Sequence, residues 1–238
     1  MPQTENKYRK MSSISIYWML FIVIAIASWI VSSSLERKFE KYSKESLPMT
    51  GRDVALKMLR ENGIDDVEVT CISGQLTDHY NPATKTVNLS EAVYKGANIA
   101  AAAVAAHECG HAVQHAKAYA PLKMRSALVP VVSFSSRWMT WILLIGMLTI
   151  ETFPTLMLVG IALFATTTLF AFITLPVEID ASRRAVNWLE ESGLTQRETI
   201  AMASDALRSA AYTYVVAALS SLATLIYYIL IFMGGRRD

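Results

Sequence analysis

The sequence predicts a mainly α-helical membrane protein with about four transmembrane helices and a small α+β unit between the first span and the others. Hydrophobic residues make up 53% of the 238-residue chain and charged residues only 18%, a composition too apolar for an ordinary soluble domain. Several uncharged runs are long enough to cross the roughly 30 Å hydrocarbon core as helices. Residues 35–126 are mostly polar, and we expect them to carry the chemistry.

Three uncharged runs qualify as spans, namely Ile14 to Val31, Phe153 to Val177 and Ser209 to Gly235. A fourth run, Ala127 to Ile150, contains Arg137, and an arginine at the bilayer centre costs about 2.5–3.5 kcal/mol on insertion scales. We therefore expect this helix to begin outside the membrane. Because only a short turn follows it, the fourth run and the run from Phe153 should form a transmembrane hairpin.

The chain divides into five predicted segments: a tail and anchor at 1–34, a stalk and folded domain at 35–126, the hairpin at 127–177, two helices at 178–208, and a last span with a basic tail at 209–238. The net charge of +2 and the lack of a basic cluster with interleaved aromatics argue against a nucleic-acid partner. Two cysteines, Cys71 and Cys109, are too few for a disulfide framework.

Hydrophobic periodicity and breaker residues predict the elements outside the spans. We expect a charged stalk helix, one amphipathic helix closed by an Asn-Gly stop, two short β-branched strands, a long alanine-rich helix, and two helices after the hairpin. In order these are Leu35 to Glu45, Gly51 to Arg60, Val67 to Ile72, Thr84 to Leu89, Gly96 to Lys117, Glu178 to Glu191 and Thr195 to Arg208. Thr195 and Glu198 have the spacing of a capping box for the last of them.

The stretch HECGHAVQH, residues 107–115, contains three of the four histidines. His107 and His111 are four residues apart, so on a helix they lie on one face and can share one metal ion. Glu108 lies next to the first ligand, where a carboxylate can act as the general base of a metallohydrolase. Zn²⁺ suits this pattern because it lowers the pKa of a bound water to about 7 and polarises a carbonyl. The alternative is that these histidines only pack or cap.

The other two reactive side chains of this stretch are less suited to ligation. His115 would lie about 12 Å along the helix from His107, too far for the same tetrahedral site. It is a candidate for a substrate or outer-shell role, or is an ordinary histidine at a helix C-terminus. Cys109 should face away from the ligand pair and pack.

A catalytic zinc needs a third protein ligand. Glu178 is a candidate, because Ala181, Ser182 and Ala185 leave one face of its helix small enough to pack against the alanine-rich helix. The alternative is a glutamate placed at a helix N-terminus by the macrodipole.

These motifs and their order along nearly the whole chain resemble the bacterial membrane-bound neutral zinc metallopeptidases of the YugP type. The strongest matches are Thr77 to Pro82, His107 to His115, Ala118 to Pro121 and Pro176 to Ala185. The chain is more distantly similar to the clan of the HtpX heat-shock protease and the CAAX-prenyl proteases. That clan has a Glu-x-x-Ala-Asp segment whose glutamate is the third zinc ligand, which implies this role for Glu178 and a gluzincin site. This chain has Ser182 where the clan has its aspartate, so a carboxylate cannot orient a ligand histidine from there.

Three residues before the alanine-rich helix are further candidates for substrate contacts. A strand beside the active helix could pair with an extended substrate, and His79 or Tyr80 could hydrogen-bond the oxyanion. For these two and for Asn81, a plain turn or core role is the alternative.

Lysine and arginine counts favour a catalytic domain on the cytoplasmic side of a bacterial membrane. The hairpin turn has no basic residue, and the catalytic side carries more of them than the side of the termini does. The terminal residues are Lys7, Arg9, Lys10, Arg236 and Arg237, against Arg37, Lys38, Lys41, Lys44, Lys117, Lys123, Arg125, Arg183 and Arg184.

The sequence thus predicts a multi-pass membrane endopeptidase with one Zn²⁺ per chain, held by His107, His111 and Glu178, and with Glu108 as general base. Its partners would be the lipid bilayer and a membrane-associated polypeptide substrate. Two alternatives remain open. An intramembrane zinc protease would need the His107 helix to span the bilayer, and a non-proteolytic scaffold or quality-control protein would have a structural zinc, which is usually closed by four protein ligands.

Overall fold

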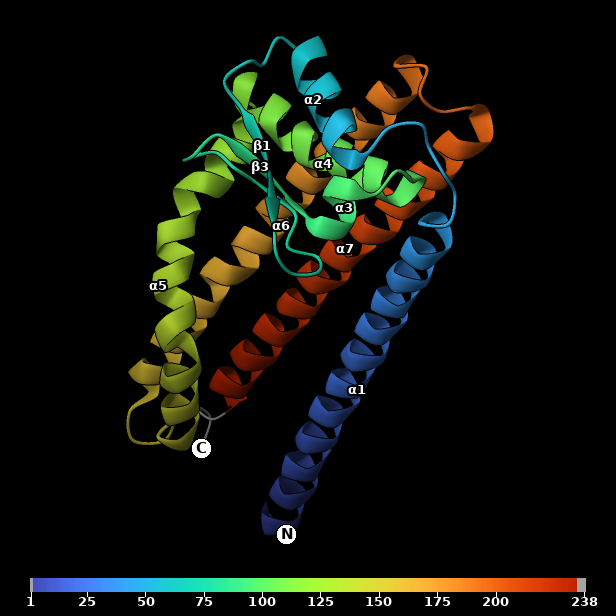
Figure 1. The fold of residues 1–238 in the computed structure, drawn as a ribbon. Helices are drawn as coiled ribbons and strands as arrows, with labels where there is room; N and C mark the ends of the chain where they lie inside the picture. Colours follow the sequence, from blue (N-terminus) through green and yellow to red (C-terminus); the bar gives the residue numbers. More distant parts are fainter. Residues whose placement is uncertain (1, 235–238) are drawn as a thin grey trace. The chain divides into compact units, whose positions relative to one another are not determined.

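A computed structural model describes the backbone of residues 2–234 and the side chains of residues 18–234. Helices dominate the described chain, and three short strands form its one sheet (Figure 1). The elements are α1 (Pro2–Tyr42), α2 (Gly51–Glu61), β1 (Glu68–Ile72), β2 (His79–Asn81), β3 (Thr86–Ser90), α3 (Glu91–Lys95), α4 (Ile99–Ala116), α5 (Ala120–Leu148), α6 (Pro154–Glu191) and α7 (Arg197–Gly234).

The chain forms two compact units, and each is assembled from separate pieces of sequence. The first unit consists of the described parts of 1–31, 128–172 and 215–238. The second consists of 32–127 and 173–214. Because four helices run through both ranges, each of these helices contributes one part to each unit.

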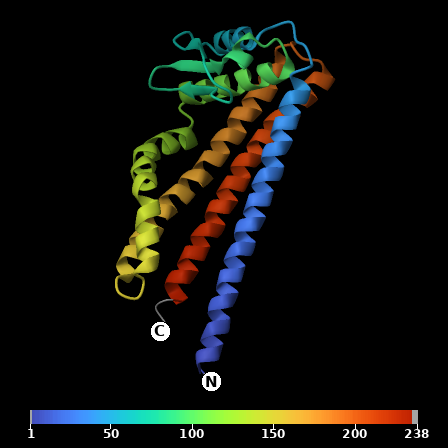
Figure 2. The same ribbon diagram turned by 60° about the horizontal axis from the view of Figure 1, so that its bottom comes forward.

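The first unit is built on a helical hairpin of α5 and α6, which lie side by side (Figure 2). Small residues permit the close approach: a Cβ on Gly146 would lie 2.7 Å from the backbone of Met157. The Ser135 hydroxyl accepts a hydrogen bond of 3.0 Å from Thr166 across the same interface. Small side chains and hydroxyl pairs of this kind are typical of helices that associate within membranes.

Among the described residues, four helices are long enough and contain a stretch apolar enough to cross a membrane: Trp18–Tyr42 of α1, and α5, α6 and α7. The predicted number of candidate spans is therefore confirmed. Of the basic residues used to predict the orientation, Arg236 and Arg237 lie outside the described residues, as do the side chains of Lys7, Arg9 and Lys10.

The second unit packs α2, the sheet and the ends of α6 and α7 around α4. The helix α2 begins with a capping box in which Thr50 and Asp53 bond reciprocally, and its buried face contributes Val54, Met58 and Leu59. In the sheet β3 is central, parallel to β1 and antiparallel to β2. The strand β2 is therefore an edge strand, and it lies beside α4 (Figures 1 and 2).

The structure differs from the predicted elements in several places. The predicted stalk helix is the end of α1, the helix predicted from Thr195 and the last span are one helix, α7, and α3 was not predicted. The pattern predicts two strands, and β2 is a third, only three residues long. The predicted helix from Glu178 is the end of α6, which runs through Pro176 without a break. The predicted capping box of Thr195 is wrong: its hydroxyl donates to the carbonyl of Leu189 (2.8 Å), and α7 begins two residues later.

Candidate metal centre

The helix α4 presents two histidines from one face. Asn98 caps its N-terminus by accepting a hydrogen bond from the Ala101 N–H at 2.9 Å, which satisfies one of the free donors of the first turn. From there no proline interrupts the helix, so His107 and His111 are held one turn apart with ring centroids 4.8 Å from each other. His111 is buried, and the His107 side chain is 13% exposed.

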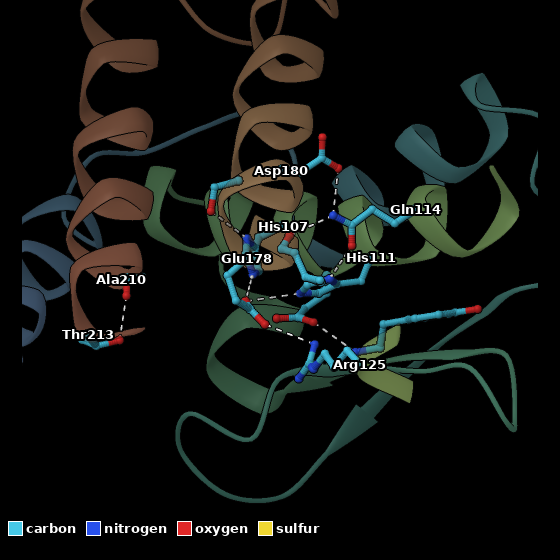
Figure 3. A network of polar contacts seen from close by, with 12 residues as sticks. His107, His111, Gln114, Arg125, Glu178, Asp180, Ala210 and Thr213 are labelled. Carbon is cyan, nitrogen blue, oxygen red and sulfur yellow. Dashed lines mark hydrogen bonds and ion pairs between the residues drawn. The ribbon is translucent and has the colours of Figure 1, made fainter. Parts of the chain in front are cut away.

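Glu178 of α6 meets both rings (Figure 3). Its Oε2 lies 3.3 Å from Nε2 of His107 and 3.5 Å from Nε2 of His111. The meeting depends on Gly110, because a Cβ at this position would lie 2.6 Å from the carbonyl oxygen of Ala181 in α6. The absence of a side chain at Gly110 thus lets the two helices approach closely enough for the three groups to converge.

The three groups fit a zinc ion. Zinc–ligand bonds of about 2.0–2.2 Å place the donor atoms of a tetrahedral site about 3.3–3.6 Å apart. Both distances from Glu178 to the imidazole nitrogens lie within this range, and the three donor atoms all lie within 4.8 Å of one another. Two imidazoles and one carboxylate are also a donor set that zinc accepts, with one coordination position left for water or substrate.

Charge compensation around Glu178 is strong. Its side chain is only 3% exposed, and its second oxygen accepts a hydrogen bond of 3.2 Å from Nη1 of Arg125, near the start of α5. A carboxylate buried to this degree needs cationic partners. Arg125 supplies one of them, and a cation held between Glu178 and the histidines would supply another.

The pKa of His111 depends on two neighbouring carboxylates, Glu108 and Glu178. Burial alone would lower the pKa of its imidazole, but the hydrogen bond to Glu178 and the negative charges of Glu108 and Glu178 outweigh burial and raise the pKa above its ordinary value. A positive charge at this place is therefore favoured. Zn²⁺ would meet the same electrostatic demand with the imidazole neutral.

The Nδ1 atoms of both histidines also have partners. Nδ1 of His107 lies 3.1 Å from the hydroxyl of Ser182, and Nδ1 of His111 lies 3.0 Å from Oε1 of Gln114. Outer partners of this kind hold an imidazole in the orientation that ligation requires.

Glu108 is 8% exposed and is held by the sheet. Its Oε2 accepts a hydrogen bond of 3.0 Å from the backbone N–H of Tyr80, in the edge strand β2. Because β2 pairs with β3 on one side only, this main-chain N–H can fix the carboxylate beside the histidine pair. This hydrogen bond joins the edge strand β2 to α4 at Glu108, the residue expected to act as general base.

The other predicted candidates lie outside the group of three. His79 bonds Thr77 O through Nδ1 (2.7 Å) and lies 3.2 Å from Asn88 Nδ2 through Nε2. The side chain of Asn81 accepts from the N–H of Ala83 at 3.0 Å, as in a turn. His115 is exposed and bonds the Tyr80 hydroxyl at 2.8 Å.

Cys109 is fully buried, with its sulfur 3.6 Å from the carbonyl oxygen of Ala55, and burial raises the pKa of its thiol. Three residues of the site have no counterpart in the sequence-based candidates, namely Gln114, Arg125 and Asp180. Arg125 was counted only as one basic charge among many, and no local pattern marks the other two.

Comparison with known proteins places the chain in a family. Residues 17–233 match the family described as "Putative neutral zinc metallopeptidase". The chain is 42% identical over 226 residues to the "Putative membrane protease YugP" of Bacillus subtilis (strain 168), which covers 92% of this chain and all of that protein. No solved structure matches. The matched range includes nearly all of the described chain, and the chain therefore belongs to the family described as "Putative neutral zinc metallopeptidase".

Proposed function

We propose that the protein is a membrane-embedded zinc endopeptidase that cleaves membrane or membrane-proximal polypeptides. The observation that carries the proposal is the convergence of His107, His111 and Glu178 from two distant stretches of chain, with Glu178 at the spacing of a tetrahedral ligand from both histidines. In this proposal the three residues hold one Zn²⁺ per chain. The small unit formed by α4 and the sheet would be a zincin-like catalytic domain of the gluzincin type.

When bound, zinc would supply Lewis acidity and a water whose pKa is near 7. Glu108 accepts the proton of the attacking water and later passes it to the leaving amine. Tyr80 keeps the Glu108 carboxylate in position through its backbone N–H.

Two observations favour an open catalytic centre over a structural zinc. Within the described residues the candidate ligands form a set of three, whereas a structural site usually has four. The two side chains that could have closed the site are engaged elsewhere, His115 with Tyr80 and Cys109 with the backbone of Ala55.

The position of α4 favours hydrolysis outside the hydrocarbon core. This helix is not one of the four candidate spans among the described residues, and it packs against α2 and the sheet. An intramembrane protease would require α4 to cross the bilayer. The basic residues on the catalytic side support a domain that faces the cytoplasm of a bacterial cell.

The direct test replaces Glu108 by glutamine in the purified protein. We expect Glu108→Gln to keep its zinc, because it is not a ligand, and to lose cleavage of an unfolded, dye-quenched polypeptide by roughly 10²–10⁴-fold, the usual contribution of a general base. Metal analysis and fluorescence measure the two effects. Glu91→Gln, the same change at an exposed carboxylate on α3, should alter neither.

The ligands are tested separately by metal analysis of His111→Ala and Glu178→Ala. Each should lose its zinc, because two protein ligands remain. Full zinc occupancy in both variants would remove the site, and undiminished turnover by Glu108→Gln would exclude that residue as the base.

A further inference from the structure

Gln114 is a polar side chain with no exposed surface, one turn after His111 on α4. A buried amide is costly unless its donors and acceptor are all satisfied. Here they are. Its Nε2 donates to the carbonyl oxygen of Val177 and to Oδ2 of Asp180, both at 2.8 Å, and its Oε1 lies 3.0 Å from Nδ1 of His111.

These contacts determine which end of the amide is which. Both partners of Nε2 are oxygens that can only accept, so the NH₂ group must face Val177 and Asp180. The carbonyl end of Gln114 therefore faces His111, and an oxygen there can only accept. It follows that Nδ1 of His111 carries the proton, which leaves the lone pair on Nε2, the atom that faces Glu178.

Asp180 is itself held in place. Its Oδ2 accepts a hydrogen bond of 2.6 Å from Nε of Arg184, one turn further along α6. The charged pair orients the Asp180 carboxylate as an acceptor. A continuous row of hydrogen bonds thus leads from Arg184 through Asp180 and Gln114 to His111. Figure 3 shows its part from Asp180 to His111.

The same amide also binds the segment that carries the third ligand. Val177, whose carbonyl it contacts, directly precedes Glu178 in α6. One side chain thus contacts a ligand histidine on α4 and the backbone next to the ligand carboxylate on α6. His107 lacks an equivalent, because the hydroxyl of Ser182 can either donate or accept and so does not select a tautomer.

We propose that Gln114, held by Asp180, is a positioning residue that fixes His111 as the Nδ1–H tautomer and sets the third-ligand segment of α6 against α4. The inference rests on the proposed zinc site. It assigns no chemistry to Gln114 itself, which does not face the donor atoms. Its contribution is to hold Nε2 of His111 and the Glu178 carboxylate in their binding positions before the metal arrives.

The test compares two variants of the full-length protein in detergent. Gln114→Met keeps the volume but removes both donors and the acceptor, and we expect zinc affinity, measured by competition with a chelator, to fall by about 10–100-fold. The double variant Gln114→Glu with Asp180→Asn exchanges donor and acceptor while keeping the net charge. The carboxylate introduced on α4 can accept hydrogen bonds from His111 and from the amide introduced on α6, but it leaves the carbonyl oxygen of Val177 without a donor. Zinc affinity should therefore recover only in part, to a value between those of Gln114→Met and the unaltered protein.

A spectroscopic measurement separates positioning from general stability. In the protein loaded with Co²⁺, the Nδ1–H protons of both ligand histidines should give solvent-exchangeable, shifted proton NMR signals. Gln114→Met should lose the His111 signal through fast exchange, and the double variant should regain it. Cys109→Ala, a buried change on the same helix that faces Ala55, should keep both signals and the zinc affinity.

Unchanged zinc affinity in Gln114→Met would overturn the inference, as would a double variant that binds no better than Gln114→Met. These outcomes differ from failure of the proposed function. That failure would appear in the unaltered protein, as no zinc bound or no polypeptide cleaved.

Discussion

The close contact between α4 and α6 at Gly110 allows a quantitative prediction. A Cβ in Gly110→Ala would lie 2.6 Å from the carbonyl oxygen of Ala181, and ordinary contact begins at 3.4 Å, so the helices must separate locally by about 0.8 Å. The contacted atoms are backbone and cannot rotate away. Zinc sites tolerate about 0.2 Å of change in their bonds, so a shift of this size should separate Glu178 from the histidine pair.

We expect Gly110→Ala to weaken zinc binding by more than about 100-fold, beyond the loss that removing an outer partner causes. Overpacking should also lower the free energy of unfolding by about 1–3 kcal/mol. Chelator competition measures the first effect, and thermal unfolding of the metal-free protein measures the second.

The matched control is Gly146→Ala in the α5–α6 hairpin. Its Cβ would clash at 2.7 Å with the backbone of Met157, which is a similar overpacking far along the chain from the ligands. It should destabilise to a similar degree and keep its zinc affinity. The reasoning would be refuted if Gly110→Ala bound zinc normally, or if Gly146→Ala lost zinc to the same extent.

Two further predictions concern charge and orientation. Arg125→Met should lower the free energy of unfolding of the metal-free protein by about 1.5 kcal/mol, the low end for a charge-assisted hydrogen bond because the arginine side chain is 31% exposed. Thermal unfolding should show a smaller loss of stability when zinc is saturating. Equal losses with and without zinc would contradict the proposed charge sharing on Glu178. Cys71 is exposed and Cys109 is buried, so a membrane-impermeant maleimide should label the protein in inside-out vesicles and not in intact cells. Cys71→Ser should abolish that labelling, and labelling of intact cells would reverse the proposed orientation.

The sequence predicted those features that depend on local spacing. The histidine pair could be predicted because four residues make about one helical turn, and its neighbours Ile99 to Ala106 indicate a helix. The apolar spans could be predicted from length alone. The position of Glu178 is different in kind, because no local pattern says which of several acids meets the histidines. The small residues Ala181, Ser182 and Ala185 made Glu178 a candidate among those acids, and resemblance to a family implied its role as third ligand.

Other features depend on packing and left no local signal. Gln114 follows the motif as an unremarkable polar residue, and its role arises only because Val177 and Asp180 of another helix surround it. The strand β2 is too short for an alternating pattern and forms because β3 pairs with it. The continuity of α6 through Pro176 was missed because proline usually ends a helix or bends it.

The second unit is assembled from two pieces of sequence, 32–127 and 173–214, with a helical hairpin between them. Its histidines emerge from the ribosome well before Glu178, since 67 residues separate His111 from that carboxylate. At roughly 5–20 residues per second, translation of that interval takes about 3–13 seconds. A nascent chain therefore carries only two of the three candidate ligands while its hairpin is being made, and the proposed zinc site cannot form until Glu178 has emerged.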